Sequence, residues 1–194
     1  MMNNQNPIDR RIRRTKKLIK DALLVLLRDK NLSQITVSEL CEAADINRKS
    51  FYNHYADIHT VLGEIEDDYV QKISSFLNQE NILYDIEDPY PFISKLTGEI
   101  QSNAGLYKLL LEAGECANLV QKMNASLCMH LRDVMEESTY IDHETFLFYI
   151  NFISAGILAV YQQWFASSEA MSMEKLSSLI CKAVCDGGSA LRQE

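Results

Sequence analysis

Residues 36–55, TVSELCEAADINRKSFYNHY, contain the start signals of two short helices separated by a few residues. The first four residues have the form of a capping box, in which the Thr36 hydroxyl accepts a hydrogen bond from the Glu39 amide and Glu39 reaches back. Asn47 can cap a second short helix, from Arg48 to about Tyr55. Two helices of about two turns each, joined by a tight turn, predict a helix-turn-helix, which places its second helix in the major groove of DNA.

The outer side of this segment has a composition that suits a DNA groove. Helices this short must pack their apolar side on a neighbour, and that side carries Val37, Leu40, Ala44, Ile46 and Phe51. Arg and Lys donate to guanine edges, Asn pairs with adenine, and Ser and Tyr donate to phosphate oxygens. The polar remainder is Arg48, Lys49, Ser50, Tyr52, Asn53 and His54.

Some of these residues also have a plain structural role open to them. Thr36 can serve only as a helix cap, and Asn53 can be no more than a solvated side chain. Tyr52 and His54 can pack against the preceding helix. Periodicity alone does not separate these roles, because patterns that resemble a helix-turn-helix are common.

Basic residues gather at the N-terminal end. The net charge of the chain is −8, but residues 1–60 carry 11 Lys and Arg against 7 Asp and Glu, whereas residues 61–194 carry 8 against 20. Six of the cations lie between Arg10 and Lys17, in the first turns of a helix that the apolar spacing predicts from Arg10 to about Lys30. A basic end joined to an acidic body indicates two roles, with the basic end a candidate polyanion surface; chance clustering is the alternative.

The rest of the chain has the apolar periodicity of helices, at about 57–78, 90–112, 115–137, 143–166 and 173–190. It shows no strand alternation and no internal repeat, and its 7 Gly and 3 Pro are too few for a loop-rich or strand-rich protein. We therefore predict an all-α protein with two domains. A three-helix helix-turn-helix domain is expected over residues 1–60, and a helical bundle for regulation and dimerisation over residues 61–194.

Residues 145–168 contain no charged side chain and are long enough to span a bilayer. However, Asn151, Ser154, Gln162 and Gln163 interrupt this stretch, and no basic cluster flanks it. A helix buried inside the subunit and against a partner subunit explains the pattern better. No association with a membrane is expected.

The sequence lacks the patterns of a catalytic or metal-binding protein. Its four histidines are scattered, and it has no nucleophile motif, phosphate-binding glycine loop or metal-spaced cluster. Its five cysteines are an odd number without a framework spacing, which is typical of free thiols in a reducing cytosol. We predict a cytoplasmic protein that is not an enzyme and has no cofactor or metal.

Residues 35–62, ITVSELCEAADINRKSFYNHYADIHTVL, resemble the N-terminal domain of the tetracycline-repressor (TetR/AcrR) family of transcriptional regulators. The resemblance covers about residues 10–62. It is carried by Thr36, Ala43, Ala44, Ile46, Ser50, Phe51, Tyr52, His54, Tyr55, Asp57 and Leu62. The chain departs from the family pattern at Lys49, where a small residue is common, and at Ile58, where the family usually has a lysine that binds a DNA phosphate.

The resemblance implies which residues contact DNA. Thr36, Tyr52 and His54 correspond to phosphate contacts, and the basic first helix, including Arg13, Arg14 and Lys17, is expected to bind the DNA backbone. The candidate base readers are Arg48, Lys49, Ser50 and Asn53. The implied partner is double-stranded DNA with a palindromic operator, and the implied activity is repression that a small-molecule effector relieves.

In the same family the C-terminal helices form a ligand pocket, and the last two helices pair with a second subunit. The candidate ligand-binding residues here are Tyr107, Leu111, Met123, Leu127, Phe148, Phe152 and Trp164. The expected homodimer interface contains Gly156 and Ala159, whose small size allows close approach, with Leu176, Ile180 and Val184. The alternative function is a helical dimeric protein-interaction module with a degenerate DNA-binding head.

Overall fold

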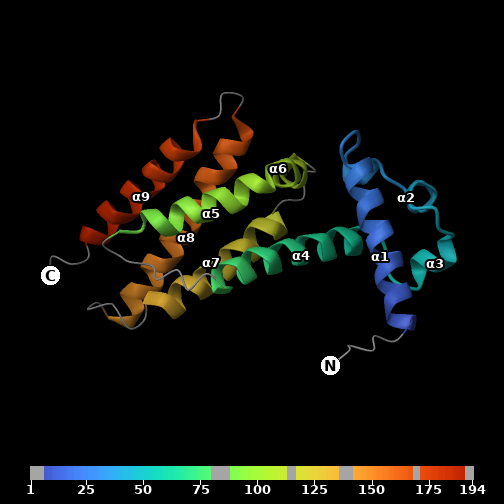
Figure 1. Cartoon of the computed structure of the whole chain (residues 1–194), viewed down its shortest axis with the longest axis horizontal. Helices are drawn as coiled ribbons and strands as arrows, with labels where there is room; N and C mark the ends of the chain where they lie inside the picture. Colours follow the sequence, from blue (N-terminus) through green and yellow to red (C-terminus); the bar gives the residue numbers. More distant parts are fainter. Residues whose placement is uncertain (1–6, 80–87, 113–116, 136–141, 168–170, 191–194) are drawn as a thin grey trace. The chain divides into compact units, whose positions relative to one another are not determined.

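The computed structural model describes residues 7–79, 88–112, 117–135, 142–167 and 171–190. Throughout these residues the ordered elements are helices, as Figure 1 shows, which confirms the predicted all-α class. The elements are α1 (Pro7–Leu26), a 3-10 turn (Leu32–Gln34), α2 (Val37–Ala43), α3 (Arg48–Tyr52), α4 (Ile58–Gln79), α5 (Tyr90–Ser102), α6 (Ala104–Glu112), α7 (Ala117–Met135), α8 (His143–Ala166) and α9 (Met173–Ala190).

Residues 90–112 form two helices, although their periodicity predicted one. The break falls at Asn103, whose side-chain amide donates to the carbonyl of Glu99 at 3.0 Å and to the Glu99 carboxylate at 3.1 Å. Side-chain bonds of this kind offer the backbone an alternative to the helix. α1 also begins earlier than expected, at Pro7, because the fixed φ of proline suits a first helical turn.

The chain forms two compact units that divide inside α4, between Asp68 and Tyr69. The first unit, here called the head, contains α1, α2, α3 and the start of α4. α2 contacts both α1 and α3 (Figure 1). Its core is made of apolar side chains from each of these helices: Ile19, Leu23, Leu40, Phe51 and Val61 are fully buried.

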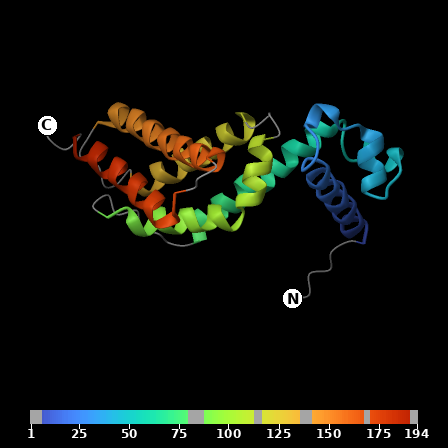
Figure 2. The same ribbon diagram turned by 90° about the horizontal axis from the view of Figure 1, so that it is seen from above.

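The second unit, here called the body, is a bundle of the remaining helices. α7 packs along α8 and α5 packs along α9, as Figures 1 and 2 show. The interior is apolar, with Phe92, Ile93, Leu131, Phe146 and Ile150 almost fully buried.

A hydroxyl network crosses the interior of the body from α5 to α8 and α9. The Thr97 hydroxyl donates to the carbonyl of Ile93 at 2.6 Å, lies 2.6 Å from the Tyr161 hydroxyl, and accepts from Ser177 at 3.1 Å. Because Thr97 has a single hydroxyl hydrogen, Tyr161 must be the donor in their shared bond. Burial raises the pKa of Tyr161 to about 12, so this donor stays protonated at neutral pH.

α8 is long and apolar enough to cross a membrane by length and composition alone, with a mean hydropathy of 1.4. One side of the helix supplies Phe146, Ile150, Ile153 and Ile157 to the core of the body. A core helix of a soluble bundle meets the same length and composition criteria, so α8 is weak evidence for a membrane span.

Candidate nucleic-acid interface

Two capped helices and a left-handed turn form the centre of the head. Thr36 accepts a hydrogen bond from the Glu39 amide at 3.2 Å, and Asn47 accepts from the Ser50 amide at 2.7 Å, so both predicted N-caps are confirmed. Between them Asp45 has a φ of 52°, a region that Asp and Asn tolerate better than most residues. The Ile46 amide closes the turn by donating to the Cys41 carbonyl at 3.0 Å.

α3 has a buried side and an exposed side. Phe51 is fully buried and Tyr55 is 3% exposed, with their ring centres 5.9 Å apart. Tyr52 is 57% exposed and meets Phe51 only with an edge-to-face ring contact. The other side chains on the outer side are those of Arg48, Lys49 and Asn53, all exposed, whereas Ser50 and His54 are half-buried.

The guanidinium of Arg48 donates a hydrogen bond to the Ser38 hydroxyl of α2. This contact fixes the position of one candidate base reader relative to the first helix of the motif. Sequence reasoning missed Ser38, which is exposed beside the cap of α2. No sequence signal indicated this contact, because Ser38 and Arg48 are ten residues apart and meet only when α3 packs on α2.

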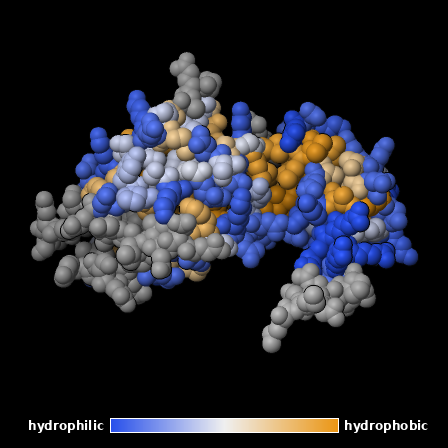
Figure 3. Space-filling model, viewed as in Figure 1, coloured by the Kyte–Doolittle hydropathy of each residue, from blue (hydrophilic) through white to orange (hydrophobic). Residues whose placement is uncertain are grey.

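The first turns of α1 carry the expected cations on the surface. Figure 3 shows strongly hydrophilic side chains over this part of α1, and Arg10, Arg11, Arg14 and Lys17 are all exposed. Arg13 is paired with Asp9 at 3.0 Å, and both side chains are more than half exposed. Such an exposed pair is worth little in water.

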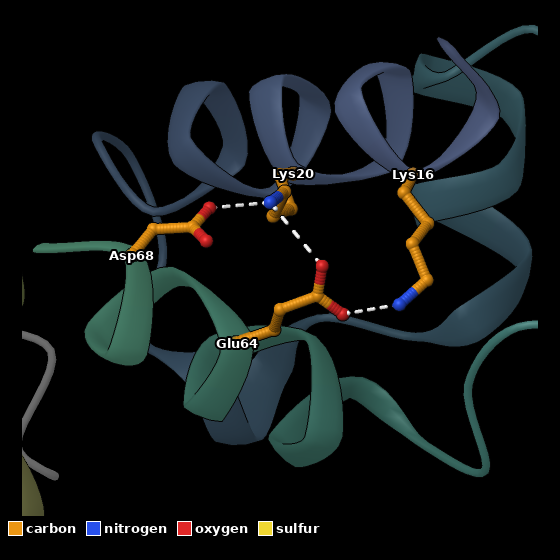
Figure 4. Close-up of polar contacts among 4 residues, drawn as sticks. All are labelled: Lys16, Lys20, Glu64 and Asp68. Carbon is orange, nitrogen blue, oxygen red and sulfur yellow. Dashed lines mark hydrogen bonds and ion pairs between the residues drawn. The ribbon is translucent and has the colours of Figure 1, made fainter. Parts of the chain in front are cut away.

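Two further lysines of α1 are bound to α4 within the head, as Figure 4 shows. The Lys16 ammonium lies 2.7 Å from one oxygen of Glu64, and the Lys20 ammonium lies 3.3 Å from the other. Lys20 also pairs with Asp68. Burial alone would raise the pKa of Glu64, but the hydrogen bonds from Lys16 and Lys20 outweigh it and lower that pKa. Glu64 is therefore ionised at neutral pH.

The body contains a small apolar cavity of about 30 Å³. Two of the expected ligand-binding residues, Tyr107 and Met123, line it. The others that line it include Ile100, Leu119, Leu158, Tyr161, Gln162 and Phe165, which sequence reasoning did not select. Periodicity places such residues inside a bundle but does not indicate which of them border a void.

The remaining candidate ligand-binding residues lie elsewhere. Leu127 belongs to the packed core, and Trp164 is half-buried, donating from Nε1 to the Met171 carbonyl at 2.8 Å. The side chain of Leu111 lies outside the described part of the chain. Phe148 and Phe152 are each 72% exposed on the outer side of α8, so they do not line this cavity and are removed from the ligand-binding set.

The residues expected at a dimer interface also divide into two groups. Gly156 and Ala159 are exposed on α8, on the same side as Phe148 and Phe152. In contrast, Leu176, Ile180 and Val184 belong to the core of their own subunit, because the inner side of α9 packs inside the bundle. These three have little surface left for a partner, which corrects the expectation for α9.

The fold and this site are those of a helix-turn-helix transcriptional regulator. A family model for the TetR family, described as "Transcriptional regulator C-terminal region", matches residues 87–185, just over half of the chain. The chain therefore belongs to the TetR family of transcriptional regulators. Its relatives in this family are regulators rather than enzymes.

Known proteins are similar to the chain in parts and as a whole. An uncharacterised HTH-type transcriptional regulator of Bacillus subtilis, YxbF, is 32% identical over 59 residues, a stretch that covers 30% of this chain and 16% of that protein. A TetR transcriptional regulator from Streptococcus agalactiae has the same fold, with a TM-score of 0.68 at 20% identity over 91% of this chain and 96% of its own. DhaS, an activator of a dihydroxyacetone kinase operon, also has this fold, with a TM-score of 0.62 and 20% identity. The match covers 92% of this chain and 96% of DhaS.

Proposed function

We propose that this protein is a cytoplasmic homodimer that binds a palindromic operator and represses transcription until a small-molecule effector releases it. The observation that carries the DNA-binding part is the one-sided surface of α3. Phe51 is fully buried, whereas Arg48, Lys49, Tyr52 and Asn53 are exposed together. These side chains can bind guanine, adenine and phosphate, so the exposed side of α3 is the part that enters the groove.

Lys49 also supplies a cation that the start of α4 lacks. Ile58, where relatives usually carry a phosphate-binding lysine, is only 8% exposed and packs into the head. Lys49 is exposed in the first turn of α3, where it can reach the DNA backbone. We assign Lys49 to a phosphate contact. Base reading is assigned to Arg48, Ser50 and Asn53. The remaining contacts to the DNA backbone are assigned to Thr36, Tyr52, His54, Arg13, Arg14 and Lys17.

Fluorescence anisotropy with DNA from upstream of the protein's own gene tests this assignment. Affinity should fall steeply with salt, because each phosphate contact contributes about 0.9 to the slope of log affinity against log salt. Lys49→Gln should flatten that slope by about one such contact on each subunit. The matched control is Lys182→Gln, at an exposed position of α9 in the body. A slope near zero in the unmodified protein would exclude DNA binding as its function.

The exposed side of α8 supports the homodimer. Phe148 and Phe152 are 72% exposed and lie in one stripe with the small residues Ala155, Gly156 and Ala159, with Leu179 of α9 also 47% exposed. Large exposed apolar patches mark interaction sites, and small residues beside them let two helices approach closely. A second copy covers both patches at once through two-fold symmetry, and an operator with two half-sites requires the same symmetry.

Arginine substitutions at helical glycines test the interface. Gly156 is exposed, and a Cβ atom added there would contact no neighbouring side chain of its own subunit within 4 Å, so Gly156→Arg should disturb a partner and leave the subunit folded. Light scattering should show a monomer, with weaker operator binding. Gly98→Arg is the matched control, because Gly98 is exposed on α5 and equally open. An unchanged dimer in Gly156→Arg would place the interface elsewhere.

The cavity in the body supports an uncharged, largely apolar effector. Its walls come mainly from Ile100, Leu119, Met123 and Phe165, and the hydroxyl of Tyr107 is buried with no hydrogen-bond partner in the described structure. Burial raises the pKa of Tyr107, so it remains a donor for one polar atom of the ligand. A volume of about 30 Å³ is far below that of a drug-sized pocket, so binding must widen it, and the unbranched Met123 can move.

Calorimetric titration of candidate effectors into the free and operator-bound protein tests this part. A releasing effector must bind the operator complex more weakly, by a coupling of about 1–3 kcal/mol, and the operator must weaken the effector equally. Tyr107→Phe should weaken the effector but leave operator affinity unchanged. Equal effector affinities in the two titrations would exclude that molecule as the signal.

Deletion of the gene tests the sign of regulation. A repressor predicts that expression from the bound promoter rises when the gene is deleted. DhaS is described as an activator, but its likeness to this protein is one of fold alone. It therefore does not decide whether this protein activates or represses transcription. A fall in expression after deletion would make this protein an activator.

A further inference from the structure

The ion pairs between α1 and α4 form a closed cluster inside the head. Lys16 and Lys20 both bind the carboxylate of Glu64, at 2.7 and 3.3 Å, and Lys20 also binds Asp68 (Figure 4). The Lys20 side chain is 18% exposed and that of Glu64 is 29% exposed. Partly buried pairs with several partners are screened less than isolated surface pairs. The cluster therefore restrains how α1 lies on α4.

The cluster also reaches the base of the recognition segment. The Lys16 ammonium lies 5.1 Å from the ring centre of Tyr55, the distance of a cation–π contact. Tyr55 is 3% exposed and packs against Phe51, the buried residue of α3. Glu64 thus keeps the Lys16 ammonium close to the ring of Tyr55, which packs against the buried side of α3.

The charge of the cluster excludes attraction of DNA as its main role. Two lysines face two carboxylates, so the four side chains together carry no net charge. The exposed cations of the first turns of α1 and of α3 lie outside it. A neutral cluster between two helices contributes geometry rather than long-range attraction.

We propose that Glu64 is a positioning residue for DNA binding. By holding Lys16 and Lys20, it sets the orientation of the basic first turns of α1 and supports Tyr55 beneath α3, without touching DNA itself. This proposal rests on the DNA-binding function proposed above. It also assigns Lys16 to the ion pairs between α1 and α4 rather than to a DNA phosphate.

Glu64→Gln tests the proposal, because positioning and simple electrostatics predict opposite signs. Loss of a negative charge near a polyanion should strengthen binding, whereas loss of positioning should weaken it by roughly 3- to 30-fold, the range for residues that act without contacting the ligand. The matched control is Asp21→Asn on α1, which removes the same charge at an exposed side chain that bonds to no other described residue. The control should bind as tightly as the unmodified protein or more tightly.

Two further variants separate positioning from charge and from direct contact. Lys16→Gln with Glu64→Gln keeps the original net charge, and it should still bind weakly. Lys16→Gln alone should weaken binding with the salt slope unchanged, whereas loss of a phosphate contact would lower that slope by about 0.9 for each subunit of the dimer. Circular dichroism melts confirm that each variant is folded at the assay temperature. If Glu64→Gln does not fold, Asp68→Asn, at the more exposed end of the cluster, should show the same sign with a smaller loss.

Binding by Glu64→Gln that matches or exceeds that of the Asp21→Asn control would overturn the positioning role. A lower salt slope in Lys16→Gln would overturn it too, because Lys16 would then contact phosphate directly. Failure of the proposed function looks different: the unmodified protein itself would show no salt-dependent binding to its operator DNA. The comparison among variants is therefore made only after that binding has been measured.

Discussion

The head and the body use polar side chains in opposite places. In the head, the hydrogen bonds and ion pairs lie at caps and on partly exposed surfaces, as at Thr36, Asn47 and Glu64. In the body, the Thr97, Tyr161 and Ser177 hydroxyls form a network within the core. Both units use polar contacts to fix how helices pack, but the head places them at helix ends and between partly exposed helix faces, whereas the body places a hydroxyl network within its core.

The lengths of the helices sharpen this contrast. α3 has only 5 residues and α2 has 7, too few to persist without tertiary support. In the body, α8 has 24 residues and α9 has 18. The geometry of the head therefore depends on a few buried residues and caps, and the head should be the more sensitive unit to single substitutions.

The largest expected effect comes from paired core truncations. Phe51→Ala in the head and Phe92→Ala in the body remove fully buried rings of equal size, each at a cost of about 3–5 kcal/mol. Phe51→Ala should abolish operator binding while the body remains dimeric, and Phe92→Ala should destabilise the body first. Urea unfolding followed by circular dichroism and light scattering measures both. Loss of the dimer in Phe51→Ala would mean that the two units do not unfold separately.

A smaller effect is expected from the hydroxyl network of the body. Thr97→Val keeps the shape of the side chain but leaves the buried hydroxyls of Tyr161 and Ser177 without their acceptor, at a cost of about 1–3 kcal/mol. Thr97→Ser keeps the acceptor and should lose less. Thermal unfolding compares the two variants. Equal stability of the valine and serine variants would show that the network does not stabilise the body.

The cap of α2 provides the corresponding test in the head. Thr36→Ala removes the acceptor for the Glu39 amide and should cost about 1 kcal/mol, while Thr36→Ser should keep most of the cap. Both variants should be assayed for operator affinity at a temperature where they remain folded. If the serine variant binds normally and the alanine variant binds weakly, the hydroxyl also contacts phosphate; equal binding leaves Thr36 as a cap alone.

The smallest effect is a pH dependence of the body. His130 is 9% exposed and stacks on Phe92 with 8° between the rings. Burial lowers the pKa of His130 below 6.5, although Asp133 opposes the shift. The unfolded chain therefore takes up a proton first, and stability is full above about pH 6.5 and falls as the pH drops below it. His130→Gln should reduce this loss in melts between pH 7 and 5, and His143→Gln, at an exposed position, should not.

Residues close in sequence made most of the head predictable. The caps at Thr36 and Asn47, the apolar spacing of α2 and the exposed Arg48, Lys49 and Asn53 all follow from contacts or periodicities within a few residues. Local hydrogen bonds and helical periodicity are properties that a short stretch carries with it. The same reasoning placed α8 and α9 at their observed bounds.

Tertiary structure alone decided which side of an apolar helix faces inward and which charges meet across the chain. α8 is apolar on nearly all sides, so its sequence could not separate the buried Phe146 and Ile150 from the exposed Phe148 and Phe152; the packing of α7 and α9 against it did. Lys16 and Glu64 are 48 residues apart, and only the packing of α1 on α4 brings them together. The sequence by itself determined local structure and the chemistry of the DNA-binding surface, because those depend on neighbours along the chain. Burial and ion pairing depend on neighbours in space, which the chain acquires only when its helices pack.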